Sequence, residues 1–360
     1  MPDHKYTQKN HDQLKTKKKK KHKGLIVLLV VLLVLAAALG AFAIWFVRLY
    51  SLTRYVSDLQ VARDLSERNT ASVASAELSG EQAEMIRASV GGSGSGDVIL
   101  PVNKDIYNLL LVGVDRRDSS WAGNSDSMIL VSVNNKKKIV HMISFMRDLY
   151  ADIPGYGVGK LNAACAHGGC PLLVQTIEEN YGVNIDNYVS VDFAGLIHII
   201  DAMGGVQIEL TDEEAEWANA YILDLADIVG EDPEPHLFAG GGVYLCDGFQ
   251  ATAYSRLRFV GNNDYERTER QRTVITGLLD KVRNMSMTQL GDLAMKILPE
   301  MTHNISAGQV LGLILQLPSI LRYDMDQDRV PYDGLYTSQN EILVPDMEET
   351  KQRLHETIYG

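Results

Sequence analysis

Five arginines lie within residues 256–272 of a 360-residue chain whose formal net charge is −12. They are Arg256, Arg258, Arg267, Arg270 and Arg272. Arginine presents a planar fork of N–H donors that matches the oxygens of a phosphate group. So dense a cluster in an acidic chain predicts an anion-binding site, and we expect the anion to be a phosphate.

The elements around these arginines decide which of them can meet. We expect residues 253–259 to form a strand. Because side chains alternate along a strand, Tyr254, Arg256 and Arg258 would then share one face. The first two arginines of the cluster would thus project together from one element.

The other three arginines stand in a segment with helical character, residues 264–279. On a helix, Arg267, Arg270 and Gln271 would share one face, whereas Arg272 would point away as a surface charge. Four arginines and one glutamine are then predicted to converge on one anion. The alternative is a solvated helix on which neighbouring glutamates pair with the arginines, and it leaves Arg256 and Arg258 unexplained.

Three apolar runs, residues 107–114, 128–133 and 138–145, predict neighbouring strands. The first reads as a strand buried on both faces, and a turn at 134–136 is typical of a hairpin. If the three strands are antiparallel neighbours, their ends meet at one edge of the sheet. The charged residues at those ends are Asp115, Asp126 and Arg147.

Two carboxylates beside an arginine suit a divalent cation that bridges to a phosphate. Mg²⁺ in proteins binds one or two carboxylates together with phosphate oxygens, and ligands of open α/β sheets gather at strand ends. Taken singly, Asp115 could end a strand and Asp126 could cap a turn. The convergence of the three positions favours a metal site.

The N-terminal region predicts where this site lies. Residues 1–24 carry nine lysines against two aspartates and read as a basic cytoplasmic tail, and residues 25–47 contain no charge. Such a run is long enough to span a bilayer core of about 30 Å, and the lysines before it place the N-terminus in the cytoplasm. A cleaved signal peptide is the alternative. Either way the arginine cluster is extracytoplasmic, which argues against a nucleic-acid partner.

The chain after the span divides into two parts. Residues 48–104 are predicted to form an extracytoplasmic stalk that ends in a flexible Gly/Ser linker, and residues 105–360 a folded domain with a C-terminal helical extension. The three cysteines make no disulfide framework. Cys165 and Cys170 could pair in an oxidising exterior, but the sequence leaves the pairing open, and a structural role is favoured for all three.

The order of motifs resembles the LytR-CpsA-Psr family of cell-wall glycopolymer transferases. The resemblance covers a motif core of residues 105–285 and rests on Val112-Gly113-Val114-Asp115-Arg116-Arg117, Asn124-Ser125-Asp126-Ser127, Ser144-Phe145-Met146-Arg147-Asp148, Lys160-Leu161-Asn162-Ala163-Ala164, Tyr188-Val189-Ser190-Val191-Asp192-Phe193, Ala253-Tyr254-Ser255-Arg256-Leu257-Arg258, Arg267 and Arg270-Gln271-Arg272. It implies an α/β fold, an α-β-α sandwich with a central mixed β-sheet preceded by one transmembrane helix.

The resemblance also implies an activity. Family members move an anionic glycopolymer, such as teichoic acid or capsular polysaccharide, from a polyprenyl pyrophosphate carrier to peptidoglycan outside the cell membrane. Asp115 and Asp126 match carboxylates that bind Mg²⁺ (or Mn²⁺). The matched pyrophosphate residues are Arg147, Arg256, Arg258, Arg267 and Gln271, and Arg270 is a further candidate from its place on the helix face. Asp264 matches an acidic residue of the same clamp, and either Asp126 or Asp264 is the hypothetical base.

Two other functions fit the same residues. One is a polyprenyl pyrophosphate hydrolase with water as acceptor, and the other is a membrane-bound regulator that binds such lipids without turnover. A lipid carrier would also need an apolar pocket. Residues 172–177 and 196–203 offer apolar helical faces for one, although ordinary core packing is the commoner role of such faces.

Overall fold

The computed structural model describes residues 35–61, 100–116, 123–261, 264–339 and 342–360. The chain divides into two compact units, Met1–Leu52 and Thr53–Gly360. In the first unit, residues 35–51 are helical. Within the described ranges, no helix is both long and apolar enough to cross a membrane. The predicted span at 25–47 begins outside those ranges, as does the linker, so both stay predictions.

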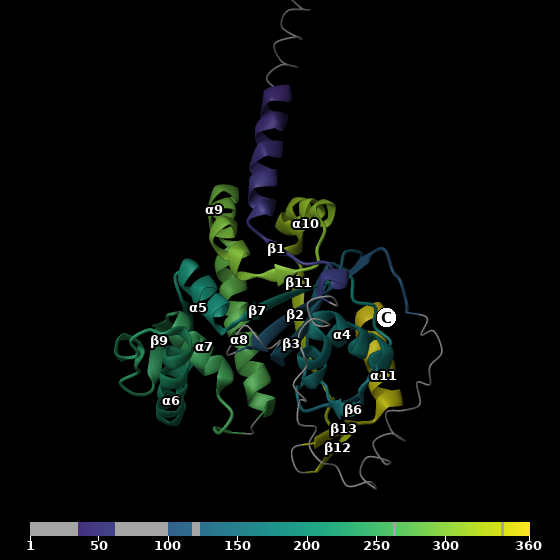
Figure 1. Cartoon of the computed structure of the whole chain (residues 1–360), viewed down its shortest axis with the longest axis vertical. Coiled ribbons are helices and arrows are strands. Elements are labelled where there is room, and N and C mark those ends of the chain that lie inside the picture. Colours follow the sequence, from purple (N-terminus) through teal and green to yellow (C-terminus); the bar gives the residue numbers. More distant parts are fainter. Residues whose placement is uncertain (1–34, 62–99, 117–122, 262–263, 340–341) are drawn as a thin grey trace, which may run out of the picture. The chain divides into compact units, whose positions relative to one another are not determined.

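A seven-stranded mixed sheet forms the centre of the second unit, in the order β1-β10-β7-β2-β3-β4-β11 (Figure 1). Strands β2, β3 and β4 are antiparallel neighbours, as predicted, while β2 runs parallel to β7 and β4 runs parallel to β11. The edge strand β1 comes from the segment predicted as a stalk. The bounds are β1 (Arg54–Tyr55), β2 (Ile106–Asp115), β3 (Asn124–Asn134), β4 (Ile139–Phe145), β7 (Asn187–Asp192), β10 (Thr302–His303) and β11 (Asp324–Val330).

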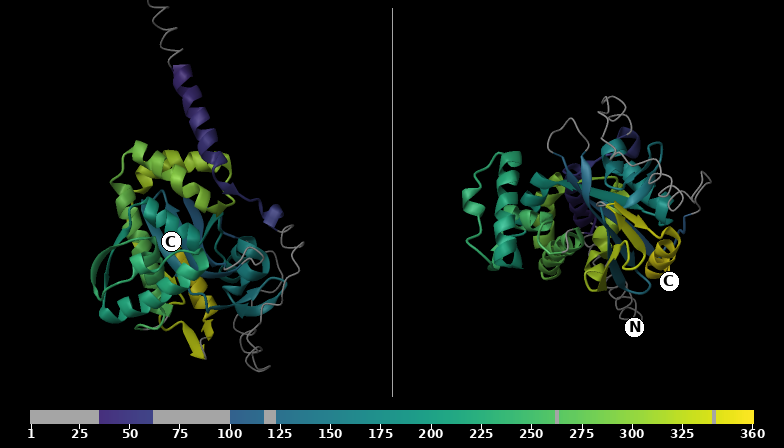
Figure 2. Two further views of the ribbon diagram at one scale, coloured as in Figure 1. Left: turned by 60° about the vertical axis from the view of Figure 1, so that its left-hand side comes forward. Right: turned by 90° about the horizontal axis from the view of Figure 1, so that it is seen from below.

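Helices cover both faces of this sheet, which confirms a mixed α/β fold (Figures 1 and 2). One hydrophobic core joins the sheet to α4 (Ala163–Tyr181) and α11 (Met347–Tyr359). A second core joins helices beyond the other face, α5 (Phe193–Ala202), α6 (Asp212–Val229), α7 (Gly248–Arg256), α8 (Asp264–Arg283) and α9 (Met287–Ile297). Helix α10 (Ala307–Ile320) follows β10.

The described part of the second unit also contains three two-stranded ribbons and two short 3₁₀ helices. The ribbons are β5 (Tyr150–Ile153) with β6 (Gly157–Lys160), β8 (Val206–Leu210) with β9 (Gly242–Cys246), and β12 (Tyr336–Gln339) with β13 (Ile342–Pro345). The 3₁₀ helices are η1 (Glu234–His236) and η2 (Leu298–Glu300). All three cysteines are buried and unbridged.

Strand β2 is not buried equally on its two faces. Its even-numbered residues are buried against the first core, whereas its odd-numbered residues are only half-buried. The prediction of a strand buried on both faces is therefore wrong. The second face is apolar because it lines a cavity rather than a packed core.

Residues 248–256 form helix α7, so the predicted strand at 253–259 is wrong. Asp247 caps this helix: its carboxylate accepts a hydrogen bond from the Gln250 N–H at 2.9 Å, and the Gln250 side chain accepts one from the Asp247 N–H at 3.1 Å. Such a capping box stabilises the first turn. The helix ends at Arg256, and the backbone turns extended at Leu257, so Arg256 and Arg258 leave from different elements.

Candidate functional site

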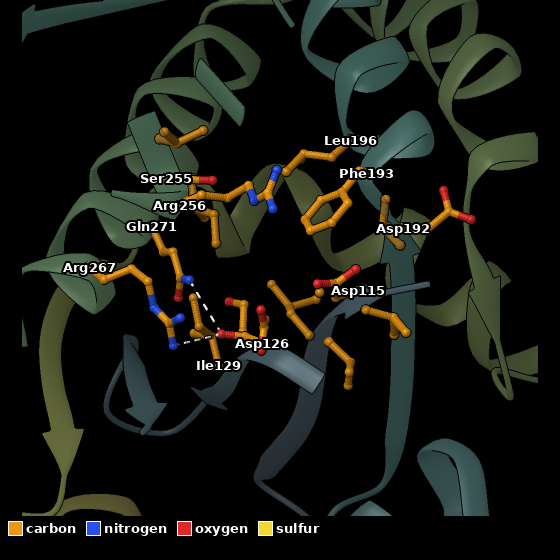
Figure 3. Close-up of a pocket in the computed structure, with 18 of the residues that line it drawn as sticks. Asp115, Asp126, Ile129, Asp192, Phe193, Leu196, Ser255, Arg256, Arg267 and Gln271 are labelled. Carbon is orange, nitrogen blue, oxygen red and sulfur yellow. Dashed lines mark hydrogen bonds between the residues drawn. The ribbon is translucent and has the colours of Figure 1, made fainter. Parts of the chain in front are cut away.

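A cavity of about 400 Å³ lies between the sheet and the helices α5, α7 and α8 (Figure 3). Seven of the nine predicted site residues line it: Asp115, Asp126, Arg147, Arg256, Arg258, Arg267 and Gln271. They reach it from six places in the chain: the end of β2, the start of β3, the segment that follows β4, helix α7, the loop that follows α7, and helix α8. The fold thus brings together residues that stand up to 156 positions apart in the sequence.

A β-bulge places Asp126 in this cavity. Gly113 pairs with Ser127 but Val114 pairs with Ser125, so Asp126 is the extra residue of β3. In an unbroken strand Asp126 would share a face with the core residue Met128. The bulge turns its side chain to the other face instead, where Ser127 and Asp115 also line the cavity.

Asp126 is the point at which the other site residues meet. Its carboxylate accepts a hydrogen bond from Nη1 of Arg147 at 3.0 Å. Its backbone carbonyl accepts from Nη2 of Arg267 at 3.3 Å and from Nε2 of Gln271 at 3.5 Å (Figure 3). Helix α8 is thereby joined to the start of β3, and two of its polar side chains are held beside the carboxylate.

The carboxylate of Asp148 holds three cationic side chains together. Its oxygens lie 2.6 Å from Nζ of Lys160, 3.4 Å from Nε of Arg147 and 3.7 Å from Nη2 of Arg258. Asp148 is buried. Both Asp148 and Lys160 stand in the motifs quoted above, but their spacing alone gives no sign of this pairing. We regard Asp148 as a positioning residue for two of the arginines.

One N–H group of the Arg256 guanidinium is hydrogen-bonded to a carboxylate, and another has no partner among the described residues. Its Nη2 donates to the Asp224 carboxylate at 2.8 Å, and its guanidinium carbon lies 4.4 Å from the centre of the Phe193 ring and 5.1 Å from that of Tyr221. Its Nη1 is buried and has no hydrogen-bond partner among the described residues. A buried donor without a partner costs free energy unless a ligand accepts from it. This atom therefore points to an anion in the cavity.

Asp192 is a further acidic residue of the cavity wall. It caps α5, since its Oδ1 accepts a hydrogen bond from the Gly195 N–H at 3.0 Å, and its Oδ2 pairs with Arg116 at 2.8 Å. Burial alone would raise the pKa of Asp192, but the Gly195 N–H and the Arg116 guanidinium outweigh it and lower this pKa. Asp192 thus stays ionised beside Asp115.

Arg270 does not line the cavity, contrary to the prediction. Its guanidinium is buried and pairs with Glu214 at 3.0 Å and with Glu266 at 2.9 Å. It also donates to the carbonyls of Leu257 and Val260, both at 3.4 Å. Arg270 therefore anchors the loop that carries Arg258. Asp264 is the first residue of α8, and its side chain lies outside what the structure describes.

Arg272 is not the surface charge that the helical pattern predicts. It is buried, donating from Nη1 to Oγ of Ser144 at 2.8 Å and from Nε to Oε1 of Gln327 at 3.2 Å. Burial lowers its pKa. This arginine ties α8 to β4 and β11, because Ser144 lies in β4 and Gln327 lies in β11.

The rest of the cavity wall is apolar. Its side chains come mainly from β2, β7, α5 and α8, and they include Leu111, Val189, Leu196, Ile199, Val274, Leu278 and Met301. The predicted lining role of residues 196–203 is met by Leu196 and Ile199. Residues 172–177 do not line this cavity, and Leu173 and Ile177 belong to the first core.

The carboxylates fit a hard divalent cation that shares its coordination with a ligand. Within the described ranges, no group of three or more His, Cys, Asp or Glu side chains could hold a metal ion alone. Asp115 and Asp126 nevertheless line one cavity together with four arginines. Two carboxylate donors leave the remaining positions of Mg²⁺ to water and phosphate oxygens, the arrangement this ion favours.

The fold and the cavity define an α/β protein whose cavity is charged at one end and apolar along the rest of its wall. The LytR_cpsA_psr family model matches residues 64–358, and the chain belongs to this family. Membership confirms the resemblance of its motifs.

Two curated relatives illustrate the family. The chain is 32% identical over 261 residues to Biofilm regulatory protein A of Streptococcus mutans, a match that covers 68% of this chain and 62% of that protein. It is 38% identical over 188 residues to the polyisoprenyl-teichoic acid–peptidoglycan teichoic acid transferase TagU of Enterococcus faecalis, covering 51% and 56%. The chain thus spans less than two thirds of the length of each.

Solved structures share the fold. One described as TagT bound to LI-WTA superimposes with a TM-score of 0.55 at 25% identity, covering 72% of this chain and 94% of that one. Another, described as the family protein YwtF (TagT) with bound octaprenyl pyrophosphate lipid, gives 0.52 at 24% identity with the same coverage. The second likeness concerns the fold alone.

Proposed function

We propose that this protein transfers an anionic glycopolymer, of teichoic acid or capsular polysaccharide type, from a polyprenyl pyrophosphate carrier to peptidoglycan. The observation that carries the proposal is one cavity with arginines and paired carboxylates at one end and an apolar wall at the other. A diphosphate needs the first and a prenyl chain needs the second. The names of the TagU and TagT relatives support the same substrate class.

The arginines would bind the diphosphate in the resting complex and neutralise it during reaction. Arg256 and Arg267 reach the cavity from different helices, so they can contact the diphosphate from two sides. Charge stabilisation of this kind is the main catalytic contribution in phosphoryl transfer, where the protein does little covalent chemistry.

Asp115 and Asp126 would hold Mg²⁺ (or Mn²⁺) against the diphosphate oxygens. When bound, the cation supplies charge neutralisation and fixes the geometry of those oxygens. Asp126 is well placed because Arg147 already orients its carboxylate. Asp192 lies in the same wall but is engaged by the α5 N-terminus and by Arg116.

The proposed step exchanges one phosphorus–oxygen bond for another. An acceptor sugar hydroxyl of peptidoglycan attacks the phosphorus that carries the polymer, and the bond from that phosphorus to the polyprenyl phosphate breaks. The products are a phosphodiester between polymer and peptidoglycan and a polyprenyl phosphate. The hydroxyl proton passes to a carboxylate, for which Asp126 and Asp264 are the candidates.

We also propose that the protein is a single-pass membrane protein with a cytoplasmic N-terminus and an extracytoplasmic second unit. The charge-free run at 25–47 after a lysine-rich tail supports this orientation. A carrier with a prenyl tail resides in the same membrane. Anchorage would therefore keep enzyme and carrier in one plane.

A labelled lipid-linked polymer tests the proposed function. The full chain, in membranes with carrier, peptidoglycan and Mg²⁺, should attach the label to peptidoglycan and release polyprenyl phosphate. Release of polyprenyl phosphate without attachment of the label to peptidoglycan would mean that the protein is a hydrolase. Tight binding of the carrier without any product, unchanged by Asp115→Asn or Asp126→Asn, would mean a regulator. Asp126→Asn and Asp264→Asn are measured separately. If a variant transfers the polymer as fast as the wild type, the residue it replaces is not the base.

A further inference from the structure

Helix α10 exposes an apolar surface that packing in the second unit does not explain. Residues 304–321 carry no charged side chain, and seven of the fourteen residues of α10 are Val, Leu or Ile. None of its residues is buried: six of these seven apolar side chains are half-buried, and Leu315 is 69% exposed. Single exposed leucines are common, but an uncharged helix without one buried residue is not.

The glycines of α10 mark its open side. A Cβ atom added at Gly308 or Gly312 would meet no described atom within 4 Å. Both positions lie on the helix face that also carries Leu315, because residues three and four apart share a face. Two small residues and an exposed leucine thus lie on one face of α10.

The chain path ties this helix to the predicted membrane span. Strand β1 begins at Arg54, seven residues after the predicted span ends at Val47, so about 25 Å of extended chain at most separates them. Strand β1 pairs with β10, Arg54 with Thr302 and Tyr55 with His303. Helix α10 begins four residues after β10. With the span in the bilayer, as proposed above, this short connection limits how far the start of α10 can lie from the membrane surface.

The apolar wall of the cavity reaches the residue before the same strand, β10. Met301, which lines the apolar wall, directly precedes β10. Figure 1 and the left view of Figure 2 show α9 and α10 together at one end of the second unit, beside β10. Helix α9 adds Met287, which is 59% exposed. A prenyl tail that leaves the bilayer here would meet the apolar part of the cavity before its charged part.

We propose that α10 is a membrane-contact helix whose Gly308, Gly312 and Leu315 face lies in the interfacial region of the lipid bilayer. The inference rests on the proposed membrane anchorage. An uncharged helix in this position gains free energy by moving apolar surface out of water. It would hold the second unit with the apolar end of its cavity toward the lipid.

Depth-dependent quenching tests the proposal. The full chain is placed in nanodiscs of phosphatidylcholine and phosphatidylglycerol, with Leu315→Cys carrying an environment-sensitive fluorophore. The matched control is Leu245→Cys on β9, since Leu245 is 67% exposed and far from α10 in sequence. The three native cysteines are buried, so the chain without an added cysteine is labelled in parallel to measure the background fluorescence. A second label at Gly308→Cys checks the same helix face.

Acyl-chain brominated lipid should quench the labels at 315 and 308 at least about twofold and leave the label at 245 nearly unchanged, because an interfacial helix lies roughly 5–10 Å into the boundary layer. Equal quenching at 315 and 245 would overturn the proposal. So would a label at 315 that is shielded from water but not quenched by lipid, which would mean a second protein copy. The readout needs no turnover, so an inactive chain whose label at 315 is quenched refutes the proposed function alone.

Discussion

Replacing Arg270 with methionine is expected to destabilise the second unit without removing a ligand contact. The Arg270 side chain is 5% exposed and pairs with Glu214, which is 13% exposed, at 3.0 Å. Removing one partner of such a buried pair costs about 3–5 kcal/mol, because the other charge stays buried. The pair with Glu266, which is 40% exposed, adds only about 0.3–0.5 kcal/mol.

For a domain of this size, such a loss corresponds to a melting temperature lowered by roughly 6–20 °C. Thermal unfolding of the full chain, followed by near-ultraviolet circular dichroism in detergent, measures it. Glu269→Gln is the control, since Glu269 is the exposed neighbour on the same helix and should change stability by less than about 0.5 kcal/mol.

A double variant separates the buried pair from other effects. Glu214→Gln keeps an acceptor for the α6 cap and removes the charge, so combining it with Arg270→Met should recover at least about 1 kcal/mol relative to the sum of the single variants. An Arg270→Met protein that melts like wild type but loses affinity for a diphosphate would refute this reasoning. It would return Arg270 to the ligand site.

Arg267→Ala should lower the affinity for a short-chain prenyl diphosphate at least about tenfold in isothermal titration calorimetry, whereas Arg283→Ala, an exposed arginine of the same helix, should not; equal effects would contradict the site. Chelation of divalent cations should stop transfer and added Mg²⁺ should restore it, and Asp115→Asn should raise the Mg²⁺ concentration required; transfer that is indifferent to both would remove the metal. Arg272→Ala should lower the free energy of unfolding by about 2–3 kcal/mol because it leaves Ser144 without its charged donor, and diphosphate affinity per folded molecule should not change.

The centre of the sheet and one end of the site could be predicted because their signals are local. Apolar runs and a polar turn predicted β2, β3 and β4, and their antiparallel order placed Asp115, Asp126 and Arg147 together. The bulge at Asp126 left no such signal. Plain alternation along β3 would put Asp126 on the core face with Met128. Asp126 faces the cavity only because Val114 pairs with Ser125, which leaves Asp126 as the extra residue of the bulge.

Helix α7 could have been predicted from a signal that was present. Asp247 followed three residues later by Gln250 is a capping box and favours a helix start, whereas the alternation of Tyr254, Arg256 and Arg258 favours a strand. A strand or a helix at this position can each direct Arg256 into the cavity. The prediction that Arg256 belongs to the site therefore agrees with the structure, although the predicted strand is wrong.

The roles of Arg270 and Arg272 could not be predicted from helical spacing. Their partners are Glu214 and Ser144, which lie 56 and 128 residues away in the sequence. Spacing on a helix indicates which side chains share a face, but not whether a carboxylate or a sheet covers that face. Arg270 and Arg272 are therefore buried in contacts away from the cavity, whereas Arg267 and Gln271 lie beside Asp126 as predicted.

A structure of the protein with a polyprenyl pyrophosphate tests the central claim most directly. The diphosphate should lie within hydrogen-bonding distance of Arg256 and Arg267 and beside Asp115 and Asp126, and the prenyl chain should run along the wall that contains Leu196. A diphosphate bound away from these four side chains, or a prenyl chain outside this cavity, would contradict the account.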